Sequence, residues 1–518
     1  MSTSLFEIVG PVMLGPSSSH TAGMARIGVM AHRIAGFIPR AITLRLSPTL
    51  STTYRGHRTD YALIGGAIGW GESDPRLRNT LEEAEKAGIS IGYAFYPRNV
   101  VHPNTAQLEM VSPEGLQVNV RGVSIGGGSL IIDAIDGDSI TLEADRYHIV
   151  LFTDGSADLS TLALPSGAQL QAGEKVTALS MPDAPDPALV SALEGLPGVS
   201  RLRLVEPVLG YGATVSERLR FTSCEELADY CKNQNLTLPQ LAADYESDRS
   251  GRSAASVRAL MLQQLEVMKE SVRRGLECEN QMLYGLTDGK DAKRLQKVWA
   301  EGKSISGGIV PGAIAKAIGV MEYNASMGCI VAAPTAGSAG IVPGCLVMLQ
   351  EAYGFSDDRI VDAMLVAAML GVVMAHRDVS FSGSVGGCQG EVGVSSGIAA
   401  AGIASLFSDD PQVPMQAMAM AIKNVTGLAC DTIAGPVEVP CIKRNAMGVA
   451  NAFAAAEMAC AGIVSYLPPD QVLDALRDAE KRLPCELRAT TVGGLASAEK
   501  AVELRKKLAA ELVKLEEP

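Results

Sequence analysis

One stretch decides the fold of the second half of this chain: residues 430–467 read CDTIAGPVEVPCIKRNAMGVANAFAAAEMACAGIVSYL. It begins with Gly and Pro between two cysteines, a composition typical of a loop that folds back on itself. It ends with Gly448 to Leu467, which is long enough to cross a bilayer. That run, however, carries Asn451 and Glu457 and consists mostly of small residues. We therefore predict a buried helix in a tightly packed helical domain rather than a membrane span.

Outward from this helix, residues 236–518 are predicted to form an all-α domain. An amphipathic stretch, Ser253 to Gly275, has apolar residues at helical spacing. The apolar run from Asp362 to His376 is predicted to be another buried helix. Helices rich in Ala and Gly, separated by Gly and Pro turns, fill the remainder.

The N-terminal part, residues 1–144, alternates short strands with helices, which indicates an α/β domain. Residues 145–235 are predicted to form a smaller α/β segment, and an ACT-like regulatory module and a plain connector explain it equally well. The predicted fold class is therefore α+β with several domains. The expected strands of the first two parts are 41–48, 107–113, 148–154 and 199–207, and the expected helices are 25–36, 78–88 and 187–196.

Composition narrows the range of partners. The chain has 518 residues, 47% hydrophobic and 19% charged, with a net charge of −13. An acidic protein of this kind is a poor partner for nucleic acid or an anionic membrane surface, so we expect neither. The first residues show no secretory signal, so we expect a cytoplasmic protein whose ten cysteines are not a disulfide framework.

Three of those cysteines lie in segments suited to an inorganic group. Cys388 lies in GGCQGEVG, Cys430 in GLACDTIAGP and Cys441 in VPCIKRN. The glycines allow the backbone to approach a bulky group closely, and three thiolates suit either zinc or an iron–sulfur cluster. A zinc site would be expected to show a C-x₂-C pair or a nearby His, and neither is present. On spacing alone, a cluster and plain core cysteines are equally good interpretations.

A second group of motifs is polar. GPSSSHT, residues 15–21, runs directly into a helix, so that its hydroxyls and amides form a natural carboxylate or phosphate pocket. GHRTD at 56–60, HPNTA at 102–106 and SIGGGS at 124–129 pair polar residues with loop formers. Together these motifs suggest one lined cleft.

These strings together resemble those of the iron–sulfur-dependent L-serine dehydratases, and the resemblance covers nearly the whole chain. The β domain of that family is matched by GPSSSHT, GHRTD, HPNTA and SIGGG. Its α domain is matched by NASMG, GGCQGEVG, LACDTIAGPVEVPCIKRN and LRATTVGGLA. The resemblance implies a substrate-binding-like β domain and a helical α domain fused in one chain, with Cys388, Cys430 and Cys441 holding a [4Fe–4S] cluster.

The chain departs from the family pattern in places. The usual GHGTD reads GHRTD, with Arg58 in place of Gly, and the tail ends LEEP. Some relatives end instead in a cysteine that can occupy the open iron, and we expect that form of self-inhibition to be absent.

The resemblance implies that L-serine is converted to pyruvate and ammonia without pyridoxal phosphate. An iron left open by three cysteines would act as a Lewis acid on the hydroxyl group, and His20 and His57 are the candidate bases. An alternative is the same chemistry on L-threonine, L-cysteine or another β-substituted acid. The expected partners are a small amino-acid substrate and a second copy in a homodimer. The candidate substrate-binding residues are Ser17, Ser18, Ser19, Thr21, His102, Asn104, Arg444 and Asn445.

Overall fold

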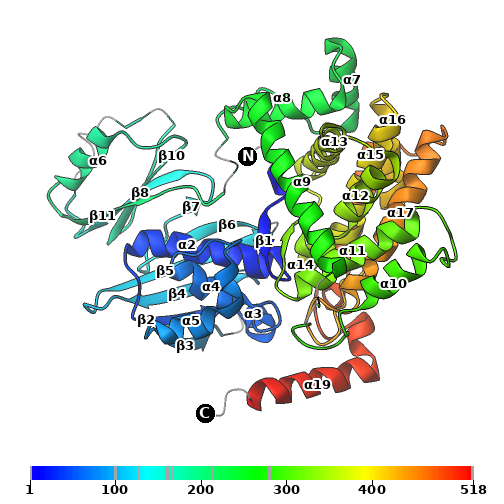
Figure 1. The fold of residues 1–518 in the computed structure, drawn as a ribbon. Coiled ribbons are helices and arrows are strands. Elements are labelled where there is room, and N and C mark those ends of the chain that lie inside the picture. The colour runs from blue at the N-terminus through cyan, green and yellow to red at the C-terminus, as the bar shows by residue number, and fades with distance from the viewer. Residues whose placement is uncertain are drawn as a thin grey trace. The chain divides into compact units, whose positions relative to one another are not determined.

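The chain divides into two compact units, each of which is described by itself. One unit, here the helical unit, comprises Met1–Ser17 with Ser216–Pro518, and the other, the sheet unit, comprises Ser18–Val215. The computed structural model (Figure 1) describes residues 3–97, 102–126, 128–157, 164–165, 167–209, 211, 214–277, 279 and 282–514.

A six-stranded sheet with the order β3-β2-β4-β5-β6-β7 forms the first part of the sheet unit. β2 and β3 are parallel, and the other neighbouring strands are antiparallel. The predicted strands at 41–48 and 107–113 are confirmed as β2 and β4. The bounds are β2 Ala41–Leu46, β3 Ser90–Phe95, β4 Thr105–Val111, β5 Gln117–Gly126, β6 Ser129–Ile135 and β7 Leu142–Glu143.

Helices α2 (Gly23–Ala35) and α4 (Thr59–Ala67) pack on each other and on this sheet. They cross closely because Gly28 and Gly66 carry no side chain: a Cβ at Gly28 would lie 2.7 Å from Gly66 Cα. The crossing brings η1 (Ser18–Ala22), the π-helical turn that leads into α2, against α4. Shorter elements complete this part: α3 Pro48–Thr53, η2 Pro75–Asn79 and α5 Thr80–Lys86.

A four-stranded antiparallel sheet with the order β11-β8-β10-β9 forms the second part of the sheet unit. Helix α6 packs its Leu193 into a core with Ile149, Leu151, Leu179 and Met181. The predicted strands at 148–154 and 199–207 and the helix at 187–196 are confirmed, whereas β9 and β10 were not foreseen. The bounds are β8 Tyr147–Thr153, β9 Gln169–Ala172, β10 Val176–Met181, α6 Pro187–Glu194 and β11 Val199–Val205.

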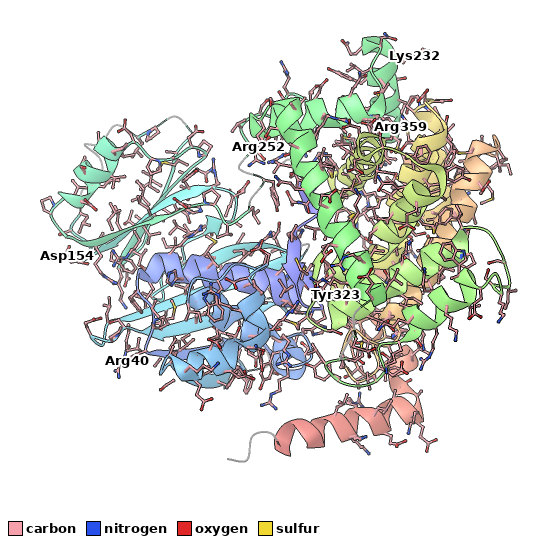
Figure 2. All side chains as sticks on the ribbon, viewed as in Figure 1. Arg40, Asp154, Lys232, Arg252, Tyr323 and Arg359 are labelled. Carbon is pink, nitrogen blue, oxygen red and sulfur yellow. The ribbon has the colours of Figure 1, made fainter. Side chains whose placement is uncertain are left out.

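The helical unit is built around α11, α13, α15 and α17, with the predicted amphipathic helix confirmed as α9 (Figure 1). Arg359 of α13 and Lys232 of α7 are labelled in Figure 2. The longer helices are α7 Cys224–Gln234, α8 Leu238–Ser250, α9 Ala254–Glu277, α10 Asp291–Ala300, α11 Val310–Ala325, α12 Ile341–Tyr353, α13 Asp357–His376, α15 Val394–Phe407, α16 Gln412–Lys423, α17 Cys441–Cys460, α18 Pro469–Arg482 and α19 Glu499–Lys514. The short helical turns are α1 Leu5–Ile8, η3 Ala336–Ser338, α14 Gly383–Gly386, η4 Gln389–Gly393, η5 Cys485–Leu487 and η6 Gly494–Ser497.

This unit is not helical throughout, which corrects the all-α prediction. β1 (Val12–Leu14) pairs antiparallel with β12 (Cys329–Val331). The N-terminal segment is fixed further by Ser4, whose hydroxyl donates to the buried Glu246 carboxylate at 3.0 Å. The unit thus includes residues that the sequence assigned to the N-terminal domain.

Within the part of the chain that the structure describes, two helical stretches are long and apolar enough to cross a membrane, Asp357–His376 and Gln389–Phe407. Their apolar windows are 78% and 83% buried inside the unit, so both are core helices of this fold. The helix predicted at 448–467 is present as α17 but ends at Cys460, and Val464 and Tyr466 are exposed.

Candidate functional site

The three predicted cysteines come together in the helical unit from three different elements. Cys388 directly precedes the π-helical turn η4, Cys430 lies in the loop after α16, and Cys441 is the first residue of α17. All three side chains are buried.

The sulfurs of Cys388 and Cys430 lie close to a carboxylate, that of Glu391. The ligand atoms of Cys388, Glu391 and Cys430 all lie within 4.8 Å of one another. A hydrogen bond with Cys388, together with burial, raises the pKa of the Cys430 thiol. Burial, followed by the charges of Cys388 and Glu391, raises the pKa of Cys441. A bound metal cation reverses this preference, because a coordinating thiol loses its proton.

Arg444, one turn along α17, holds this arrangement in place. Its Nη1 donates to Cys388 Sγ at 3.2 Å and to the carbonyl of Ala429 at 2.7 Å, and its Nη2 donates to Asp431 Oδ1 at 2.7 Å. The guanidinium therefore ties two of the three cysteine segments together. It also supplies a charge-assisted hydrogen bond to a sulfur.

The segment LRATTVGGLA, at 487–496, closes over the cysteine loop. The amide of Cys430 donates to the carbonyl of Leu487 at 2.8 Å, and the amide of Ala489 donates to the carbonyl of Cys430 at 2.7 Å. The amide of Leu495 donates to Asp431 Oδ2 at 2.8 Å. Two backbone–backbone hydrogen bonds and one bond from a backbone amide to a side chain thus tie the loop to this segment.

The side chain of Asn445, a candidate substrate-binding residue, forms hydrogen bonds to the backbone of the helical unit. Its Oδ1 accepts from the amide of Gly340 at 3.1 Å, and its Nδ2 donates to the carbonyls of Gly337 and Cys441 at 2.9 Å each. In this structure it positions the glycine-rich loop before α12.

Three buried thiols fit an iron–sulfur cluster by their chemistry, since such clusters are held by cysteine thiolates. They also fit a single zinc ion, on which two sulfurs at a bond length of about 2.3 Å would lie about 3.8 Å apart. The sulfurs of Cys388 and Cys430 lie within 4.8 Å of each other, so metal analysis must decide between a single ion and a cluster.

The sheet unit brings a second set of predicted residues together. His20 of η1 and His57, before α4, have ring centroids 4.7 Å apart. Asn104 Oδ1 lies 3.0 Å from His20 Nε2, and Thr21 donates its hydroxyl to the carbonyl of His57 at 2.7 Å. The Asn104 amide nitrogen donates to the carbonyl of Ser124 at 3.3 Å. One or two residues of each of the four polar motifs therefore lie close together in the sheet unit, whereas the predicted cleft stays a prediction.

Burial sets the protonation of this pair. It lowers the pKa of His20 to about 4, against a smaller opposing effect of the hydrogen bond with Asn104. Burial and the nearby His20 lower the pKa of His57 to about 3. Both imidazoles are therefore neutral near pH 7 and can accept a proton. Burial lowers the pKa of His102 as well, and its Nδ1 accepts from the amide of Asn104 at 3.1 Å.

Ser18 is buried, whereas Ser17 and Ser19 are partly exposed. Arg58 adopts the left-handed conformation, with φ 52°, and its guanidinium carbon lies 4.2 Å from the ring centroid of Tyr61. A positive φ explains why Gly suits this position in the motif GHGTD.

Comparison with known proteins agrees with this geometry. The family described as "Serine dehydratase alpha chain" matches residues 233–496. The "L-serine dehydratase" of Mycobacterium bovis is 30% identical over 515 residues, which cover 96% of this chain and 98% of that protein. The chain belongs to the L-serine dehydratase family.

Two-chain relatives also match. The "Probable L-serine dehydratase, alpha chain" of Bacillus subtilis is 41% identical over 288 residues, covering 56% of this chain and 95% of that protein. The beta chain of the same name and organism is 39% identical over 148 residues, covering 29% of this chain and 67% of its own length. This chain is thus a single-chain member of the L-serine dehydratase family.

Sequence reasoning missed Glu391 in this family site. The residue stands in the motif GGCQGEVG, three positions after Cys388. The available signal was the spacing, because a residue three positions after Cys388 at the start of a helical turn lies on the same face. Burial raises the pKa of Glu391 to about 7, against the smaller opposing effects of a hydrogen bond with Thr335 and the charge of Arg444.

Proposed function

We propose that this protein is a lyase that deaminates L-serine to pyruvate and ammonia with a [4Fe–4S] cluster. The observation that carries the proposal is the convergence of Cys388, Cys430 and Cys441 as buried thiols in a chain of this family. Full-length relatives with the name L-serine dehydratase support the substrate.

Cys388, Cys430 and Cys441 would hold the cluster. When bound, such a cluster supplies an open iron that stabilises the negative charge developing on the departing hydroxide. Arg444 donates to Cys388 Sγ, a charge-assisted hydrogen bond that helps to hold this sulfur in place. Gly383 leaves the necessary space, since a Cβ there would lie 2.9 Å from Cys430 Sγ.

The neutral histidines of the sheet unit are our proposal for the base that removes the α-proton. His20 Nε2 faces Asn104 Oδ1 at 3.0 Å, so that nitrogen carries the proton and Nδ1 has the lone pair. His57 Nδ1 lies 3.2 Å from the carbonyl of Thr53, which by the same argument leaves Nε2 as its acceptor. Ser17, Ser18, Ser19, Thr21, His102, Asn104 and Arg444 remain proposed substrate-binding residues.

L-Threonine and L-cysteine are the alternative substrates of the same chemistry. Arg58 motivates them, because it places a bulky cation where the family motif has Gly. We also propose a reducing cytoplasm as the location, where the three thiols stay available, and a homodimer as the assembly.

The test is pyruvate formation from L-serine by anaerobically purified enzyme, before and after exposure to air. We expect oxygen-labile activity that is lost in Cys388→Ala and kept in Cys345→Ala, a control cysteine that is equally buried in α12 of the same unit. Activity that survives in Cys388→Ala contradicts the proposal. Faster turnover of L-threonine or L-cysteine moves the assignment to that substrate.

A further inference from the structure

Glu391 places a carboxylate among the thiols of the metal centre. Its Oε2 lies 4.0 Å from Cys430 Sγ, and a ligand oxygen of its carboxylate lies within 4.8 Å of Cys388 Sγ. Two thiol sulfurs and one carboxylate oxygen thus lie close together. Carboxylate oxygen and cysteine sulfur together form a set that binds a metal ion readily.

Among the residues that the structure describes, none forms an ion pair with Glu391. Arg444 acts on Glu391 through its charge, while its Nη1 donates to Cys388 and Ala429 and its Nη2 donates to Asp431. The side chain of Glu391 is partly buried, and partial removal of a carboxylate from water without a cation beside it carries a desolvation cost. A bound metal cation would provide the missing charge.

Two glycines keep space open around this carboxylate. A Cβ at Gly383 would lie 2.6 Å from Glu391 Oε2, and a Cβ at Gly337 would lie 3.3 Å from Oε1. Neither Gly337 nor Gly383 has a positive φ. The lack of a side chain at these positions therefore serves the space around Glu391 rather than the backbone conformation.

We propose that Glu391 is a fourth protein ligand of the metal centre: in the substrate-free enzyme its carboxylate binds the iron that the three cysteines leave open. The inference rests on the proposed function, because it needs the cluster. A carboxylate suits this position because its oxygen is a harder and more exchangeable ligand than a thiolate, so that a substrate hydroxyl can replace it.

The test asks whether water reaches the open iron in the resting enzyme. The holoenzyme is purified anaerobically, reduced, transferred to water enriched in ¹⁷O, and studied by electron–nuclear double resonance without substrate. We expect no ¹⁷O coupling in the wild type and clear coupling in Glu391→Gln and Glu391→Ala. Glu322→Gln is the matched control, because Glu322 is a buried carboxylate of the same unit that accepts from the amide of Asp291 at 2.8 Å. It should behave as the wild type.

Equal ¹⁷O coupling in the wild type and Glu391→Gln overturns the inference, since water would then be the fourth ligand. The wild-type measurement decides this even if a variant folds poorly. A preparation without any iron–sulfur cluster overturns the proposed function as well, so the two failures are distinguishable. As a second readout, the conversion of the cluster to a three-iron form in air should be about tenfold faster in Glu391→Gln than in the wild type. An unchanged rate would count against the ligand role.

Discussion

Acid should destabilise the sheet unit through His20. Burial lowers the pKa of this histidine to about 4 from 6.5, so between these values the unfolded chain binds more protons than the folded one. The contribution of His20 to stability is therefore intact above pH 6.5 and is lost as the pH falls toward 4. Linkage gives a loss of about 2 kcal/mol at pH 5 and about 3 kcal/mol below pH 4.

The two tryptophans of the chain allow the sheet unit to be observed alone. Trp70 lies in the sheet unit and Trp299 in the helical unit, so in Trp299→Phe the fluorescence of Trp70 reports on the sheet unit. Urea unfolding at pH 7.5 and pH 5 is then compared with and without His20→Gln, in which the new amide can still donate to Asn104. The difference between the two proteins separates His20 from the other titrating groups of the unit.

We expect the protein with His20 to lose about 2 kcal/mol more than the His20→Gln protein between the two pH values. If both lose the same amount, His20 is not a buried neutral histidine. The reasoning that makes it a candidate base would then be refuted.

Three further substitutions test the site and its surroundings. Arg444→Met removes the hydrogen bond to Cys388 Sγ, so iron should be released to a chelator about tenfold faster than from the wild type. An unchanged release rate would argue against a role of Arg444 in holding this sulfur. Gly383→Ala brings a methyl group to 2.6 Å from Glu391 Oε2. This should cost about 1–3 kcal/mol of stability through overpacking and should lower the iron content per chain. Full iron occupancy would show that the space is not needed. Arg58→Gly and Arg58→Ala both lose the stacking on the Tyr61 ring, but only Gly suits a φ of 52°. The Gly variant should therefore be more stable to urea than the Ala variant by about 1 kcal/mol. Equal stabilities would contradict the left-handed conformation.

Local patterns predicted those elements whose burial follows a simple period. β2 alternates buried Ile42, Leu44 and Leu46 with partly exposed residues, and this alternation is visible in the sequence. β10, Val176–Met181, is buried at every position, so it shows no alternation and was missed. The end of α17 was misplaced because residues 461–467 stay apolar after the helix stops.

Long-range pairing was outside the reach of local patterns. β1 pairs with β12, with Leu14 opposite Cys329. The sequence of either three-residue strand does not predict its pairing partner. This pairing moves the N-terminal segment into the helical unit.

The candidate site was predicted in part. The cysteines were found through their flanking motifs and the family resemblance, and the structure brings them together. Glu391 could not be recognised from its local sequence, because its significance comes from the sulfur of Cys430, a residue distant in the chain. The role of Asn445 in positioning the loop before α12 likewise depends on tertiary contacts.

The most direct test of the account is the iron and acid-labile sulfide content of the anaerobically purified protein. We expect about four irons and four sulfides per chain, as a [4Fe–4S] cluster requires, and loss of both in Cys430→Ala. Stoichiometric zinc without sulfide would contradict the cluster and leave a single-ion site. A protein without any metal would show that Cys388, Cys430 and Cys441 are only core residues.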